Sequence, residues 1–386
     1  HGGKHTMSEL ITTHARANTR LHLLASVSAL SLLAAVTSQA IAKDSDRPTL
    51  WIELGAQLDR IDGGQQLLAP SFATATPRPD FEDISALATQ RLPRYGIDMD
   101  GRLSFQPKGS DWVFSAAIRY GRSNSNKHVH QQTPGVVTKG GLLQGMYTAP
   151  GKKVVLLPAR FDDTRAEHNE SHAVLDFMAG KDVGLGLFGG SSVINAGVRF
   201  AQFSVKSGIK LQSNPDLHIT HHGTGLKYKV EDAHHSYFAS QQSDRTFRGV
   251  GPSISWDASA PVLGNADAGE ISVDWGVNGA VLFGRQTART SHLTTGRYFN
   301  YNYPVGGHRT KSSYQLSGAH ARSRSVVVPN VGGFAGLSFR YPNAKVSFGY
   351  RADMFFGVID GGIDARKTYD RAFYGPFASV SIGLGG

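Results

Sequence analysis

The chain has no cysteine among its 386 residues, and charged residues make up only 18% of it. The absence of cysteine excludes disulfide bonds, thiolate nucleophiles and cysteine-held zinc, but it leaves the compartment open. Also absent are the Walker motif, the dinucleotide-binding fingerprint, the nucleophile elbow and the His-Glu-x-x-His zinc motif. The sequence therefore carries no signature of the common nucleotide-dependent or hydrolytic enzymes, and no cofactor is expected.

Long apolar runs are missing as well. Beyond residue 42, no stretch reaches the 18 apolar residues that indicate a membrane-spanning helix. If the chain crosses a membrane, it must therefore do so as a closed β-barrel, because a closed barrel also satisfies every backbone hydrogen bond within lipid. Glycine is abundant, with 45 residues, which is typical of turn-rich β proteins.

The N-terminal segment has the pattern of a secretory signal peptide. Basic residues precede an apolar stretch at residues 23–36, and Ala40 and Ala42 supply the small-residue pattern after which signal peptidase cleaves. The alternative, a helical membrane anchor, is disfavoured because serines and a threonine dilute the stretch. We expect residues 1–42 to be upstream residues plus a cleaved signal peptide, and residues 43–386 to form one barrel domain.

The chain is basic, with a formal net charge of +10 at pH 7. Removal of residues 1–42 takes away three basic residues and one acidic residue, which lowers the net charge to +8. A basic exported protein favours anionic partners such as lipopolysaccharide, outer-membrane lipid or small anionic solutes. Nucleic acid is not expected, since no base-stacking or zinc-finger motif is present.

Residues 344–358, AKVSFGYRADMFFGV, alternate between apolar and polar side chains. Phe348 and Tyr350 fall on one face of a strand, and Arg351 and Asp353 fall on the other. A half-buried soluble sheet has this pattern, and so does a barrel strand between lipid and lumen. Ten segments alternate in this way: 48–60, 95–106, 112–122, 171–181, 191–206, 245–260, 270–285, 326–340, 345–356 and 373–384.

The joins between these segments alternate in length. Four are short, among them PKGSD between the second and third segments and YPNA between the eighth and ninth, whereas the other five run from about 16 to nearly 50 residues. Short turns at one end and long loops at the other are typical of outer-membrane barrels. We therefore predict an all-β, closed antiparallel transmembrane barrel of about ten strands, with short periplasmic turns and long external loops, assembled by the barrel assembly machinery.

Aromatic side chains at the strand ends support a membrane barrel, because such barrels carry aromatic girdles at both lipid interfaces. Those near the short-turn ends are Trp112, Trp256 and Tyr341, and those near the long-loop ends are Tyr95, Tyr120, Phe283 and Tyr374.

The polar faces carry charges of both signs, which we expect to pair inside the barrel. The predicted lumen network comprises Arg119, Arg199, Asp257, Asp274, Arg285, Arg340, Arg351 and Asp353. A barrel of this size is narrow. Such a network would brace the wall and leave at most a thin water path.

Four Gly-rich blocks resemble a known family. They are FRGVGPSISWD (247–257), WGVNGAVLFGR (275–285), VVPNVGGFAGLSFR (327–340) and YDRAFYGPFASVSIGL (369–384). These blocks are similar to those of the pore-forming outer-membrane proteins related to the Legionella major outer-membrane protein, although Tyr374 stands where that family usually has histidine. The resemblance implies a porin-like channel for small solutes or ions in the outer membrane of a Gram-negative bacterium.

Two other functions remain open. Omptin proteases are ten-stranded outer-membrane barrels whose site combines Asp-x-Asp with Asp-x-His, and this chain contains Asp98 with Asp100 and Asp216 with His218. A spacing of two residues places both members of a pair on one strand face, where they could share a water molecule. The other alternative is a surface adhesin or receptor that acts through the external loops.

The histidines of residues 43–386 all fall in or beside the predicted external loops. Imidazole binds zinc, copper and nickel, so these residues are candidate metal ligands, although a polar, protonatable loop surface explains them equally well. The candidates are His128, His130, His221, His222, His234 and His235.

Overall fold

The computed structural model describes residues 50–63, 95–133, 154–156, 160–184, 190–214, 218–224, 227–265, 269–303, 309–363 and 365–384. Residues 1–42, with Ala40 and Ala42 of the predicted cleavage site, lie outside these ranges. Among the described residues, no helix has the length and apolar character needed to cross a membrane.

Twelve strands contain most of the described residues. They are β1 (Leu50–Gly63), β2 (Tyr95–Phe105), β3 (Trp112–Thr133), β4 (Val154–Leu156), β5 (Arg160–Asp182), β6 (Ser192–Asn214), β7 (His218–Thr224), β8 (Lys227–Asn265), β9 (Gly269–Tyr303), β10 (Arg309–Tyr341), β11 (Ala344–Asp360) and β12 (Thr368–Leu384).

Ten of these strands form a closed ring in which every neighbour is antiparallel. The order around the ring is β1, β2, β3, β5, β6, β8, β9, β10, β11, β12 and back to β1. The prediction of a closed antiparallel barrel is therefore confirmed, with the ten barrel strands in chain order. The two additional strands lie outside the ring, because β4 pairs with β7, and β7 extends the edge of β8.

The first and last barrel strands meet at the short-turn end, where Leu50 pairs with Leu384. The turns at residues 106–111 and 342–343 lie at this same end. In the first of them, the Ser110 amide donates to the Pro107 carbonyl at 3.1 Å. Gly109 there has φ of 70°, a left-handed conformation that glycine adopts without strain.

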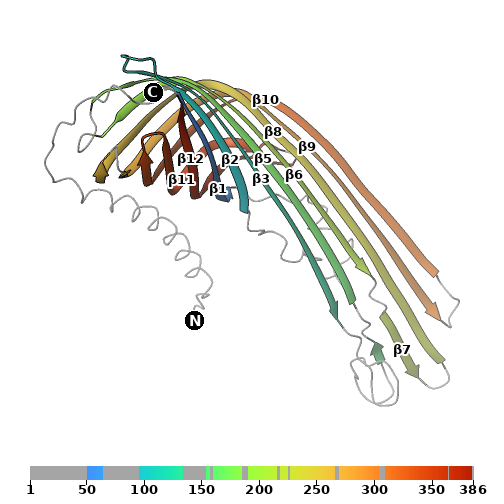
Figure 1. Cartoon of the computed structure of the whole chain (residues 1–386). Coiled ribbons are helices and arrows are strands. Elements are labelled where there is room, and N and C mark those ends of the chain that lie inside the picture. Colours follow the sequence, from blue (N-terminus) through green and yellow to red (C-terminus); the bar gives the residue numbers. More distant parts are fainter. Residues whose placement is uncertain are drawn as a thin grey trace, which may run out of the picture.

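Six of the barrel strands continue far beyond the long-loop end of the other four. β8, β9 and β10 contain 39, 35 and 33 residues, whereas β1 and β2 contain 14 and 11. Figure 1 shows β3, β5, β6, β8, β9 and β10 extending together as a curved sheet past the closed barrel. Several segments predicted as external loops are thus strand extensions, hydrogen-bonded to their neighbours.

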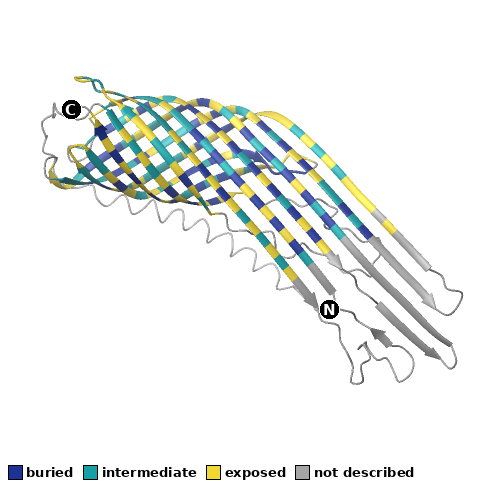
Figure 2. Cartoon of the chain, turned by 45° about the vertical axis from the view of Figure 1, so that its right-hand side comes forward, coloured by how far each residue is buried: buried dark blue, intermediate teal, exposed yellow. Residues whose placement is uncertain are grey.

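The outer surface of the closed part carries an apolar belt. Figure 2 shows buried and exposed residues alternating along its strands, as period-two side-chain geometry requires. The exposed residues are mostly large and apolar, such as Leu54 at 68% and Met99 at 67%. Trp112, Tyr341, Tyr95 and Tyr120 are exposed near the two ends of the belt, as expected of aromatic girdles at lipid interfaces. The apolar belt thus gives the closed part the surface of a transmembrane barrel.

Candidate functional site

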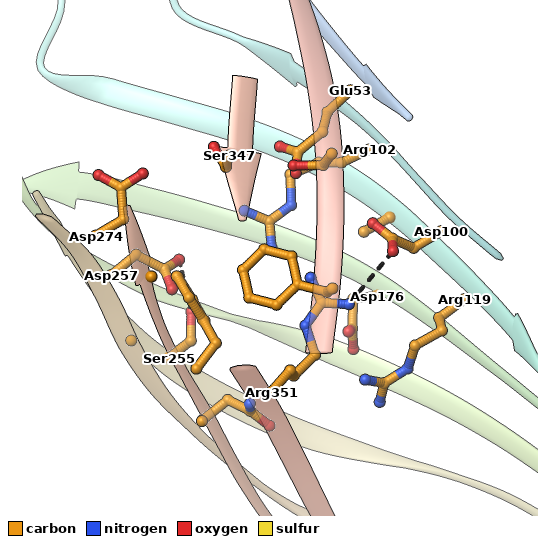
Figure 3. A pocket seen from close by; sticks show the side chains of 18 of the residues that line it. Glu53, Asp100, Arg102, Arg119, Asp176, Ser255, Asp257, Asp274, Ser347 and Arg351 are labelled. Atoms are coloured by element: carbon orange, nitrogen blue, oxygen red, sulfur yellow. Dashed lines mark hydrogen bonds and ion pairs between the residues drawn. The ribbon is translucent and has the colours of Figure 1, made fainter. Parts of the chain in front are cut away.

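The half of the lumen nearest the short turns contains a cavity of about 250 Å³. Its wall runs from Arg340 and Lys345, beside the turn between β10 and β11, to Arg119 and Asp353. Six acidic and six basic side chains line it, so its wall has no net formal charge. Figure 3 shows several of these side chains converging from different strands. A space of this size holds several water molecules, so this half of the lumen can be hydrated.

Opposite charges pair around the cavity. Lys345 Nζ lies 2.5 Å from Asp274 Oδ2, joining β11 to β9. Arg199 on β6 donates from Nε and Nη2 to the two carboxylate oxygens of Asp176 on β5, at 2.7 and 2.9 Å. A two-point arginine–carboxylate contact fixes both side chains in position. These pairs brace the wall and narrow the cavity.

Arg351 lies inside the barrel. Its guanidinium stands 4.8 Å from the centre of the Phe377 ring, a cation–π contact. Its Nη1 donates to Asp100 on β2 at 3.4 Å, as the dashed line in Figure 3 marks. The polar face of residues 344–358 is therefore the lumen face of β11.

Seven of the eight charges predicted for the lumen line this cavity: Arg119, Arg199, Asp257, Asp274, Arg340, Arg351 and Asp353. The prediction was wrong for Arg285. Its side chain is exposed on the outer face of β9 and donates to Ser323 Oγ at 2.6 Å. The reason is strand periodicity, since Arg285 is two residues from Phe283 and shares its outward direction.

Four phenylalanine rings fill the lumen above the cavity, and we call them the aromatic plug. Phe203 lies with its ring centre 4.8 Å from that of Phe355, 5.8 Å from Phe373 and 6.1 Å from Phe247. All four side chains are buried. Because β6 and β12 lie five steps apart in a ten-membered ring, the contact between Phe203 and Phe373 spans the lumen. The described structure is therefore closed at this level.

A buried ion pair crosses the lumen just above the plug. Arg371 on β12 donates from Nε to Glu170 Oε1 on β5 at 2.8 Å, with both side chains almost completely buried. His168 Nε2 lies 3.2 Å from the other oxygen of Glu170.

The end of β11 turns into the mouth of the barrel. Gly357 adopts φ of 63°, and the pairing with β12 shifts in register between Phe355 and Ile359. Residues 358–363 are buried as a result. Arg245 of β8 donates to the Gly361 carbonyl at 3.3 Å, which ties this segment to a strand three positions away in the ring. Burial lowers the pKa of Arg245 to about 10.

Asp360 anchors the same segment. It accepts from Arg322 at 3.1 and 3.2 Å and from the backbone amides of Gly362 and Lys367 at 3.1 and 3.2 Å. Burial alone would raise the pKa of Asp360, but these hydrogen bonds outweigh it and hold that pKa below its ordinary value.

The two described residues of the protease alternative, Asp98 and Asp100, face the interior of the barrel and not its rim. Asp98 lies beneath the aromatic plug, 1% exposed, with its Oδ2 2.8 Å from His172 Nε2. Asp100 faces the cavity. Asp216 lies outside the described residues, and of the His218 side chain nothing is described. Asp98 is thus out of reach of a surface peptide.

The histidines predicted for external loops lie on strands. His128 and His130 are exposed on one face of β3, and His128 pairs with Asp163 of β5. His221 and His222 belong to β7, and His234 and His235 belong to β8. The loop assignment was wrong for these residues, because the strands continue beyond the membrane.

Sequence reasoning missed the aromatic plug and the two buried polar residues beneath it. Asp59 and His172 belong to no motif, and each is brought into the lumen by the ring of strands. A signal existed for Phe373, which is four residues from Phe377 on the polar face of β12. An aromatic residue on that face predicts a side chain inside the barrel.

No family model and no curated protein matches the chain. Among solved structures, the transport unit of the autotransporter AIDA-I from Escherichia coli is 8% identical, covering 92% of this chain and 94% of that one, with a TM-score of 0.24. The translocator domain of NalP from Neisseria meningitidis is 10% identical, covering 97% and 98%, with a TM-score of 0.19. The Pseudomonas putida toluene transporter TodX is 10% identical, covering 88% and 89%, with a TM-score of 0.16.

These neighbours are outer-membrane β-barrels. The TM-scores are too low to carry an inference about this chain, so its class, a ten-stranded antiparallel barrel of the transmembrane type, rests on its own strand pairing and apolar belt. The resemblance to the Legionella family stays a prediction.

Proposed function

We propose that the protein is a narrow, gated pore for ions or small solutes in the outer membrane of a Gram-negative bacterium. The observation that carries this proposal is the order in which polar and aromatic layers follow each other along the lumen. A polar cavity of about 250 Å³ fills the half nearest the short turns, and the aromatic plug closes it on the external side. Hydrophobic constrictions of this kind gate channels by excluding water. The Gly-rich blocks that resemble the Legionella pore proteins agree with this function.

The charges of the cavity define the expected selectivity. Its wall carries six acidic and six basic side chains, so the positive surplus of the whole chain does not lie on the cavity wall. Anions and cations are expected to permeate to similar extents once the plug opens. Size excludes larger solutes, because a ten-stranded barrel leaves little space beyond its own side chains.

The plug provides the decisive experiment. Single-channel currents of the refolded chain in planar bilayers should show rare, brief openings. In the double variant Phe203→Ala and Phe373→Ala, the rings that span the lumen are gone, and the open fraction should rise at least about tenfold. A matched control is Phe177→Ala with Phe200→Ala, which removes an edge-to-face pair exposed on the outer surface of β5 and β6.

Both double variants are first checked for folding by their heat-modifiable migration in gels. A folded plug variant that shows no channel openings would overturn the pore, and an equal rise in open fraction in the control would overturn the gating role of the plug. Nothing among the described residues favours a protease or an adhesin over this function.

We also propose that the barrel binds lipopolysaccharide at its external rim. Val250 pairs with Phe283 at the edge of the apolar belt, and two residues farther along, Arg248 pairs with Arg285. Both arginines are exposed. Like charges directly opposite each other are destabilising, unless an anion lies between them. Lipid phosphates are the anions available at this depth, and insertion there would depend on the barrel assembly machinery.

A further inference from the structure

We propose that Asp59, Asp98 and His172 form a binding site for a divalent transition-metal ion such as Zn²⁺, directly beneath the aromatic plug. They come from β1, β2 and β5, are at most 2% exposed, and place their ligand atoms within 4.8 Å of one another. In a tetrahedral zinc site with bonds of about 2.0–2.1 Å, ligand atoms lie roughly 3.3 Å apart. Small side-chain movements would therefore close this set on an ion.

Gly121 allows the three side chains to meet. It lies on β3, between β2 and β5, and the register places it beside both Asp98 and His172. A Cβ atom at this position would overlap both side chains. With glycine there, His172 Nε2 reaches across the strand to within 2.8 Å of Asp98 Oδ2. The missing side chain on the lumen face of β3 thus leaves space in which side chains from β1, β2 and β5 meet.

The cluster brings two buried carboxyl groups together. Asp59 and Asp98 are each 1% exposed. Arg119 is directed toward Asp353, with Nη1 2.5 Å from its Oδ2, and reaches Asp98 only at 3.9 Å from Nε. Two buried carboxyl groups that share only this distant arginine are costly to ionise, and one divalent ion would stabilise both as carboxylates.

Unsatisfied oxygen atoms point to the same conclusion. Within the part of the chain that the structure describes, Asp59 Oδ2, Asp98 Oδ1 and Gln57 Oε1 are buried without a hydrogen-bond donor. Gln57 is 2% exposed, and its Nε2 donates to Asp59 Oδ1 at 2.6 Å, which holds its amide group against the cluster. Native structures seldom leave buried acceptors unpaired. Metal coordination would use these lone pairs, with Gln57 offering an additional oxygen.

The donor set and its surroundings define the class of ion. One imidazole nitrogen with carboxylate oxygens suits Zn²⁺, Mn²⁺ or Co²⁺, whereas Ca²⁺ requires six to eight oxygen ligands. Access is from below, because Arg119 lines the cavity and also reaches Asp98 of the cluster. On the other side, the His172 ring packs 4.0 Å from the centre of Phe373. An ion here would join β1, β2 and β5 and fix His172 under the plug.

Cobalt provides a spectroscopic test on the refolded chain after treatment with a chelator. Co²⁺ should bind at one ion per chain with visible absorption bands, and Zn²⁺ should displace it. Asp59→Asn and His172→Gln should each raise the cobalt Kd by at least about tenfold. His128→Gln is the control, since this exposed histidine also faces an aspartate, Asp163, and its loss should leave the bands unchanged.

X-ray absorption of the zinc-loaded wild type tests the site without any variant. One imidazole and oxygen ligands at about 2.0–2.1 Å support it, whereas two or more imidazoles place the ion among the other histidines and overturn it. Absence of stoichiometric cobalt binding by the folded wild-type chain also overturns the proposal. Because these measurements do not use conductance, a silent barrel that binds cobalt would refute the pore and leave the metal site standing.

Discussion

The type of side chain that lines the lumen differs from one level of the barrel axis to the next. Paired charges occupy the half near the short turns, the aromatic plug follows, and the ion pair of Arg371 with Glu170 lies just above it. Each layer joins strands that are distant in the ring, so each stabilises the closed barrel by cross-bracing. The energetic weight of these contacts differs, because a charge is costly to bury once its partner is removed, whereas a ring leaves only a cavity.

The ion pair above the plug should therefore be sensitive to removal of one partner. Arg371→Met leaves Glu170 buried without its cation, and we expect the free energy of unfolding to fall by about 3–5 kcal/mol. The measurement is the guanidinium midpoint of the folded barrel in detergent. Arg366→Met, at an exposed position in the connection just before β12, should change stability little.

The double variant distinguishes an ion pair from simple packing. Arg371→Met combined with Glu170→Gln removes both charges and should recover much of the lost stability. If the losses in unfolding free energy of the two single variants instead add up in the double variant, the two side chains do not stabilise the barrel by pairing with each other.

Asp360 gives a pH-dependent prediction for the mouth. Its pKa is lowered from an ordinary value of 3.8, so its stabilising contribution is fully present above about pH 4 and is lost as the pH falls through the lowered value. Hydrogen exchange of the Gly362 and Lys367 amides, corrected for intrinsic rates, should therefore accelerate only below pH 4. Asp360→Asn should leave both amides fast at every pH. Protection that is the same in this variant would contradict the anchoring role, and Asp182→Asn at the other end serves as the control.

At the scale of elements, the sequence predicts where strands lie within the membrane better than where they end outside it. The predicted segment 270–285 begins one residue after the first residue of β9, Gly269, but it stops well before the last residue of β9, Tyr303. Within lipid, one face must be apolar and the other is polar, so the period-two signal is strong. Beyond the lipid both faces can be polar, as at Arg289 and Thr290, and the alternation that reveals a strand disappears.

The sequence also predicts some residues of the candidate sites better than others, because a local pattern shows which face of a strand a residue occupies but not which residue it meets on another strand. Arg351 and Asp353 could be placed in the lumen from alternation within one strand. The meeting of Asp98 with His172 could not, because it depends on the register of three strands and on the missing side chain at Gly121. Register follows from the pairing of whole strands, which no local pattern contains.

Gly121 allows a test at this scale. Gly121→Ala would push a methyl group into Asp98 and His172, and overpacking of this kind costs about 1–3 kcal/mol. Gly101→Ala is the matched control on the neighbouring strand, because its Cβ would meet Leu54 and Ile118 at ordinary contact distances of 3.7 and 3.8 Å. Heat-dependent gel migration should show a lower unfolding temperature for the first variant and no loss for the second. Equal behaviour of the two would mean that the lumen tolerates a side chain at residue 121.

The whole molecule combines an apolar belt with a charged external rim. The belt ends at Val250 and Phe283, and the arginine pair Arg248 and Arg285 lies immediately beyond it. We expect this arrangement to set the depth of the barrel in the membrane, because apolar side chains favour lipid and arginines favour the phosphate layer. If lipid phosphates offset the mutual repulsion of the two arginines, as we propose, that depth depends on the lipid present.

Lipopolysaccharide should accordingly stabilise the barrel more than neutral lipid does. In detergent with added lipopolysaccharide, the unfolding temperature should rise, and the rise should shrink in high salt because the contact is electrostatic. The variant Arg248→Ser with Arg285→Ser should lose most of this rise, while Lys108→Ser, an exposed cation in the short turn after β2, should keep it. Lipopolysaccharide stripped of its phosphates keeps its acyl chains but loses the charges that the arginines would bind. It should therefore raise the unfolding temperature of the wild type and of the double variant by the same amount. If the double variant responds to intact lipopolysaccharide as the wild type does, the arginine pair is not its binding site.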